Sequence, residues 1–122
     1  MKKFVSLGSL NAFLAVAMGA FGAHALKSIL SADKLSTWQT GVTYQFYHAL
    51  GLIIIGLLAK ACPDSAMIRT AGWVMCTGII LFSGSLYLLS LSGLTSLGMI
   101  TPFGGFAFLL SWLLLVFGVL RS

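Results

Sequence analysis

The fold is decided by residues 70–120, which read TAGWVMCTGIILFSGSLYLLSLSGLTSLGMITPFGGFAFLLSWLLLVFGVL and contain no charged side chain. A soluble domain could not keep so long an apolar segment away from water, whereas a lipid bilayer would bury it. One spanning helix takes about 20 apolar residues, so the stretch must hold two helices. The sequence breaks at Ser90, Ser92 and Gly93 and restarts at Thr101–Pro102, because Thr suits an N-cap and Pro the first helical turn.

Two further uncharged stretches precede it, and Pro63, Asp64 and Ser65 mark the boundary between the second and third spans. Hydrophobic residues make up 59% of the chain and charged residues 7%, which fits a membrane protein. The sequence therefore predicts an all-α fold: an integral membrane, antiparallel four-helix bundle. We expect a single domain over residues 1–122, with spans at about 4–23, 40–60, 66–90 and 102–120.

The N-terminus allows a second interpretation, a secretory signal peptide. Lys2–Lys3, the apolar run and Ala23-His24-Ala25 follow the pattern of a signal with an A-x-A cleavage site. The apolar run is longer than a usual signal core, and its glycines suggest helix packing. We therefore favour a first membrane span.

The distribution of Lys and Arg predicts the orientation of the chain. With four spans, both termini lie on the same side as the loop between spans two and three. That side carries five of the seven basic residues, whereas the other carries only Lys27 and Lys34. Because basic residues accumulate in cytoplasmic loops, we expect both termini in the cytoplasm. Residues 24–39 and 92–100 would then face outward.

Small residues are the expected packing surfaces, because lipid gives helices no hydrophobic reason to associate and close backbone contact must replace it. Such residues recur at helical spacing in spans one, three and four. The predicted packing positions are Gly8, Gly19, Gly22, Gly72, Gly84, Gly104, Gly105 and Gly118. So small a bundle leaves much apolar surface free, so we also expect a homo-oligomer.

The densest polar group lies at the start of span two, where Thr40, Tyr44, Tyr47 and His48 share one helix face. His24 ends span one at the same predicted membrane face, so the two histidines could approach one another. Histidine there could relay protons, bind a metal or haem iron, or sense pH. The alternative is that both histidines cap helix ends or hydrogen-bond a neighbouring Tyr, Thr or Gln.

Several classes of function are disfavoured. Asp33 and Asp64 are the only carboxylates, and both look like helix N-caps in loops. A carrier built on an intramembrane acid therefore does not fit. Two histidines without a nearby Cys, Asp or Glu make a poor zinc site, and no Ser/His/Asp set has a convincing orienting acid. We therefore expect no enzyme and no cofactor. The basic residues are scattered singly, which argues against nucleic acid as a partner.

Four blocks of the sequence stand out together: Gly19–Leu26, Trp38–His48, Phe82–Tyr87 and Thr101–Gly105 followed by Trp112. They resemble the domain-of-unknown-function 423 family of small bacterial membrane proteins, although Ser111 stands where glycine is expected. The resemblance covers nearly the whole chain. It implies four spans in the bacterial inner membrane and brings no established activity or catalytic residue.

By the expected topology, all four blocks converge on one outward-facing region. We therefore predict a polar pocket that binds or transports a small molecule, lipid or ion. Its predicted residues are His24, Tyr44, Gln45, His48, Ser85, Tyr87 and Thr101. The alternative is a structural role, in which the small-residue faces stabilise a larger membrane complex. The expected partners are the lipid bilayer, further copies of the chain and another membrane protein.

Overall fold

A computed structural model describes residues 1–122 as four long helices with no strand. Short 3-10 turns, η1 (Leu26–Ser28) and η2 (Thr95–Met99), lie in two of the connections. The helices are α1 (Lys2–His24), α2 (Ala32–Ala61), α3 (Ala66–Ser92) and α4 (Thr101–Leu120). All four are long and apolar enough to cross a membrane, which confirms the predicted all-α membrane fold.

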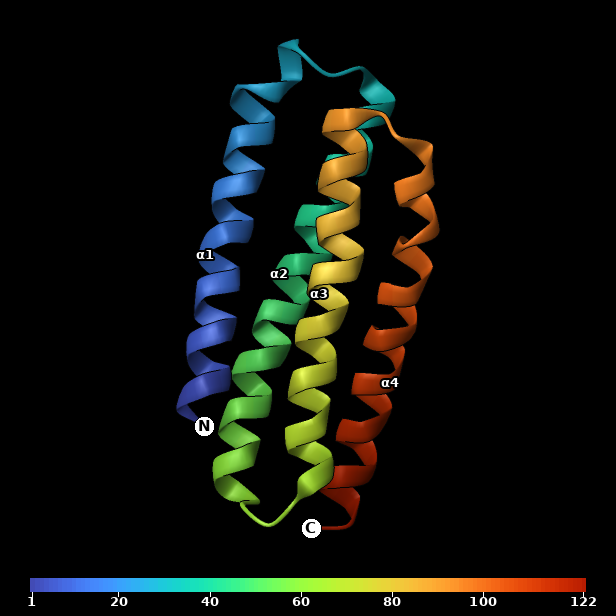
Figure 1. The fold of residues 1–122 in the computed structure, drawn as a ribbon. Coiled ribbons are helices and arrows are strands. Elements are labelled where there is room, and N and C mark those ends of the chain that lie inside the picture. The colour runs from blue at the N-terminus through green and yellow to red at the C-terminus, as the bar shows by residue number, and fades with distance from the viewer.

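The helices run up and down in sequence order (Figure 1). Both termini and the turn between α2 and α3 lie at one end of the bundle, and the two 3-10 turns lie at the other. The extensive contacts join consecutive helices, with α2 and α3 in the middle. Helices α1 and α4 flank this central pair on opposite sides (Figure 1).

The start of α2 and the helix caps differ from the sequence-based expectation. Helix α2 begins at Ala32 rather than near residue 40, because the Ser31 side chain caps it by accepting a hydrogen bond from Lys34 N at 3.3 Å. Ser65 caps α3 in the same way, so neither Asp33 nor Asp64 is an N-cap. At 30 residues α2 is about 45 Å long, more than the bilayer core of about 30 Å requires.

The main core lies between the central helices and one face of each flanking helix. Its nine buried residues are Phe4, Leu52, Ile55, Ile68, Ala71, Met75, Ile79, Phe108 and Leu115. A smaller cluster of Leu26, Trp38 and Val42 fills the end that holds the 3-10 turns. These two clusters fix how each helix is rotated about its axis.

Most of the predicted packing glycines lie where helices approach closely. A Cβ at Gly8 would stand 2.6 Å from the Ala49 carbonyl oxygen, and one at Gly104 would overlap the Phe82 backbone. Gly22, Gly72 and Gly118 are similarly crowded, and a Cβ at Gly19 would stand 3.3 Å from Val42 Cγ1.

Two glycines depart from the expectation. A Cβ at Gly84 would meet nothing within 4 Å, and one at Gly105 only a Phe82 ring carbon at 4.0 Å. Successive helical residues point about 100° apart, so Gly104 faces α3 while Gly105 does not.

Candidate functional site

The seven predicted ligand-binding residues do not form one pocket. Gln45 and Tyr87 belong to a chain of hydrogen bonds inside the bundle, and Ser85 pairs with Thr101. Tyr44 and His48 line a groove between α2 and α4. His24 lies apart from the others at the exposed end of α1.

A chain of three polar side chains links α1, α2 and α3. The Tyr87 hydroxyl donates to Gln45 Oε1 at 2.6 Å, and Gln45 Nε2 donates to Asn11 Oδ1 at 3.1 Å. Asn11 Nδ2 in turn donates to the Leu7 carbonyl at 2.8 Å, and no buried polar side-chain atom in the protein lacks a partner. Interhelical hydrogen bonds of this kind hold bundles together in lipid.

Two further hydrogen bonds join α3 to its neighbours. The Ser85 and Thr101 hydroxyls lie 2.6 Å apart, and Ser83 donates to the Gly41 carbonyl at 2.8 Å. Thr101 is the first residue of α4 and makes no side-chain cap, contrary to the N-cap expectation. Its hydroxyl instead pairs with Ser85, so it connects helices.

The two histidines are not brought together. Gly8 of α1 packs against Ala49 of α2, so His48 lies about level with Gly8, roughly four helical turns below His24. Because α2 starts at Ala32, His48 lies in the middle of that helix rather than at its outer end. The expected approach of the histidines therefore depended on placing the start of α2 too late.

The His48 ring is held by two hydrogen bonds and by stacking on a neighbouring ring. Its Nδ1 lies 2.7 Å from the Tyr44 carbonyl, and Trp112 Nε1–H donates to its Nε2 at 3.1 Å. Since Nε2 accepts, the ring proton is on Nδ1 and the imidazole is neutral. The ring also stacks on Phe108, with centroids 3.5 Å apart and planes inclined by 6°.

A groove of about 650 Å³ runs beside His48 between α2 and α4. Drug-sized ligands occupy pockets of about 300–1,000 Å³, so its size suits a small molecule. Its lining residues are Tyr44, Tyr47, His48, Phe82, Pro102, Gly105, Phe106, Phe108, Leu109 and Trp112. None of the α4 residues in this lining is among the predicted ligand-binding residues, although Pro102, Gly105, Leu109 and Trp112 recur at helical spacing.

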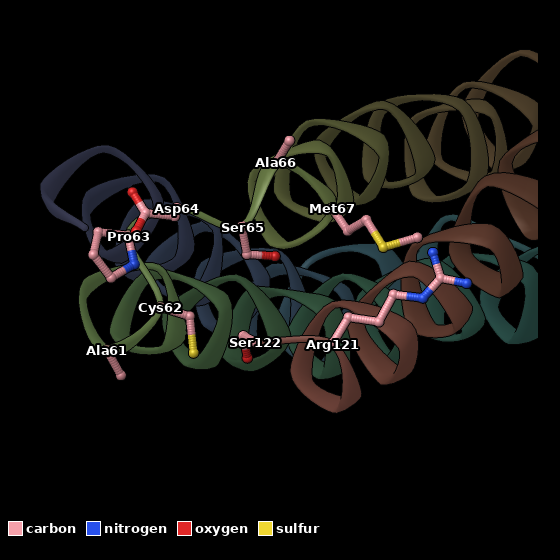
Figure 2. Close-up of a pocket in the computed structure, with 9 residues that line it drawn as sticks. All are labelled: Ala61, Cys62, Pro63, Asp64, Ser65, Ala66, Met67, Arg121 and Ser122. Atoms are coloured by element: carbon pink, nitrogen blue, oxygen red, sulfur yellow. The ribbon is translucent and has the colours of Figure 1, made fainter.

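A second cavity of about 480 Å³ lies at the end of the bundle that holds both termini. Figure 2 shows it between the α2–α3 turn and the end of α4, with Arg121 beside Met67 and Asp64 on the far side. The Ser65 hydroxyl in its wall is used as the α3 cap. No group of three or more potential metal ligands gathers there or elsewhere in the protein.

The family described as "Protein of unknown function (DUF423)" matches residues 18–105. The UPF0382 membrane protein YwdK of Bacillus subtilis is 49% identical over 121 residues, which cover 99% of this chain and 98% of the relative. A UPF0382 membrane protein of Staphylococcus saprophyticus is 48% identical, covering 99% of both chains. No solved structure matches.

Proposed function

The chain belongs to the DUF423 family of membrane proteins, as the sequence blocks indicated, and we propose that its α2–α4 groove binds a small lipid-soluble molecule. The observation that carries the proposal is the glycine in the groove wall. A glycine inside a helix costs about 1 kcal/mol relative to alanine. Packing does not require one at Gly105, where a Cβ would meet only Phe82, at 4.0 Å. The missing side chain instead widens the groove.

The position of the groove supports a ligand that arrives from the membrane. Its walls belong to α2 and α4, with Phe82 of α3 between them, and all three helices are apolar enough to span a bilayer. Most of its lining residues are hydrophobic. Among its lining residues, Tyr44, Tyr47, His48 and Trp112 carry polar side-chain atoms. This composition suits a molecule that is mostly apolar and carries one or two polar groups.

The basic residues support an orientation for this site. Lys and Arg are concentrated at the end of the bundle that holds both termini, which we propose to be the cytoplasmic side of a bacterial inner membrane. The groove extends from Pro102, at the start of α4, to Trp112 near its middle, and so lies in the outer half of the membrane. We propose binding rather than catalysis, because no carboxylate contacts His48 to orient it as a general base.

Native mass spectrometry of the protein, extracted gently with its lipid, tests this proposal. Gly105→Leu places a side chain in the groove, whereas Gly84→Leu adds the same side chain where nothing lies within 4 Å. We expect wild type and Gly84→Leu to carry a defined extra mass that Gly105→Leu loses. An extra mass that survives in Gly105→Leu, or none in wild type, would refute groove binding.

A second candidate function, assembly into a larger membrane complex, is favoured by the exposed face of α1. This helix is the least buried of the four, and Leu10, Phe13 and Val16 on it are more than half exposed. A second copy of the chain or another membrane protein could cover this face. Gly19 cannot serve to test it, because it faces Val42 inside the bundle.

The matched test uses two phenylalanines of equal exposure. Phe13 on α1 is 68% exposed and Phe103 on α4 is 67% exposed. Assembly through α1 predicts that Phe13→Ala releases a co-purifying subunit whereas Phe103→Ala retains it. If wild type, Phe13→Ala and Phe103→Ala all purify as monomers without another subunit, this role is excluded.

A further inference from the structure

We infer, on the basis of the proposed function, that the groove selects a neutral, flat, conjugated ring with oxygen substituents, as in the quinone class. The competing lipid-soluble ligands are an acyl chain and an organic cation. Three features of the groove distinguish among them: its ring faces, its free hydroxyl groups and its lack of negative charge.

The walls of the groove are made largely of flat rings. Seven of its ten lining residues carry an aromatic or imidazole ring. Neighbouring rings are already in contact, with Tyr44 and Phe82 centroids 4.7 Å apart and the His48 ring parallel to Phe108. Aromatic rings prefer offset-stacked or edge-to-face partners, which a planar ligand provides and a flexible chain does not.

Two phenol hydroxyls at the groove are free to bind a polar group. Tyr87 is the only tyrosine whose hydroxyl makes a hydrogen bond within the protein. The hydroxyl groups of Tyr44 and Tyr47, which line the groove, have no hydrogen-bond partner. The Trp112 N–H and both His48 nitrogens are already engaged. At membrane depth a free hydroxyl lacks water as a partner, and a carbonyl or hydroxyl oxygen on the ligand would supply one.

The charge around the groove disfavours an organic cation. The only carboxylates are Asp33, in the first turn of α2, and Asp64, in the turn before α3, and neither lines the groove. The chain carries a net charge of +5. Aromatic ring faces attract cations, but burying a cation in the membrane without a counter-charge costs more than that attraction returns, so a neutral ligand fits better.

Binding of three small probes to the purified full-length protein tests the inference. The probes are duroquinone as the neutral ring, dodecanol as the chain and tetraphenylphosphonium as the cation. Binding is measured by the rise in unfolding temperature that a ligand of the folded state produces, and for duroquinone also by quenching of tryptophan fluorescence.

We expect duroquinone to bind wild type and Gly84→Leu, and to bind Gly105→Leu about tenfold more weakly or not at all because leucine fills the groove. Tyr44→Phe and Tyr47→Phe should each weaken binding by about two- to tenfold if that hydroxyl bonds the ligand. The double variant Tyr44→Phe/Tyr47→Phe must lose affinity. Unchanged affinity in the double variant would overturn the assigned hydroxyl contacts.

The remaining outcomes separate this inference from the function on which it rests. Dodecanol or tetraphenylphosphonium binding that Gly105→Leu abolishes, without duroquinone binding, overturns the ring preference but leaves groove binding standing. Duroquinone binding that Gly105→Leu does not change places the ring elsewhere and overturns the inference. If no probe binds, the inference fails. If the native extract also carries no extra mass, the proposed function fails with it.

Discussion

Two adjacent glycines of α4 should respond differently to the same substitution. A Cβ at Gly104 would stand 2.7 Å from the Phe82 Cα, whereas ordinary contact begins at 3.4 Å, so α4 must move away from α3 by at least the 0.7 Å difference (3.4 − 2.7). Gaps of about 0.5–1 Å forfeit a quarter to a half of the dispersion energy of each contact. Overpacking of this kind costs about 1–3 kcal/mol, so Gly104→Ala should destabilise the bundle by that amount.

The control is Gly105→Ala. Its Cβ would approach only Phe82, at 4.0 Å, and alanine is the better helix former, so the folded state should be unchanged or up to about 1 kcal/mol more stable. Reversible unfolding of both variants in the same detergent, followed by circular dichroism, gives the difference. Equal stabilities for Gly104→Ala and Gly105→Ala would refute the packing of α4 against α3 described above.

Three further predictions follow from individual contacts. Tyr87→Phe removes the donor to Gln45 Oε1 and should lower the free energy of unfolding by about 1 kcal/mol. In the Gln45→Leu background the same substitution should have no such effect, which a double-mutant cycle measures. Trp112→Phe deprives His48 Nε2 of its donor and should cost a similar amount, with a shift of the imidazole nitrogen signals in NMR spectra as the specific readout. A membrane-impermeant thiol reagent should leave Cys62, in the α2–α3 turn, unlabelled in intact cells and label it after lysis. Labelling of Cys62 in intact cells would show that the proposed orientation is wrong.

The number of helices and their membrane character were predictable because both are local properties. A run of apolar residues long enough to span lipid is visible without knowing its neighbours. The start of a helix is also a local property where one capping residue decides it. The Ser31 side chain caps α2, so this helix begins at Ala32. A polar first turn carries no apolar pattern, so residues 32–39 were assigned to a loop.

The candidate site was only partly predictable. Tyr44 and His48 stood out as polar residues in an apolar helix, and both line the groove. Gln45 stood out for the same reason, yet it lies inside the bundle and bonds Tyr87 and Asn11. A polar residue in a membrane helix can serve a ligand or a neighbouring helix, and its own sequence does not distinguish the two.

The sequence alone determined that this protein is a membrane protein with four spanning helices, because the length and hydropathy of each segment can be read without knowing its neighbours. Only the tertiary structure decided which side of each helix faces inward. That rotation separates Gly104 from Gly105, pairs Trp112 with His48 and opens the groove between α2 and α4. It depends on how side chains of different helices interlock, and a step of one residue turns a side chain by about 100°.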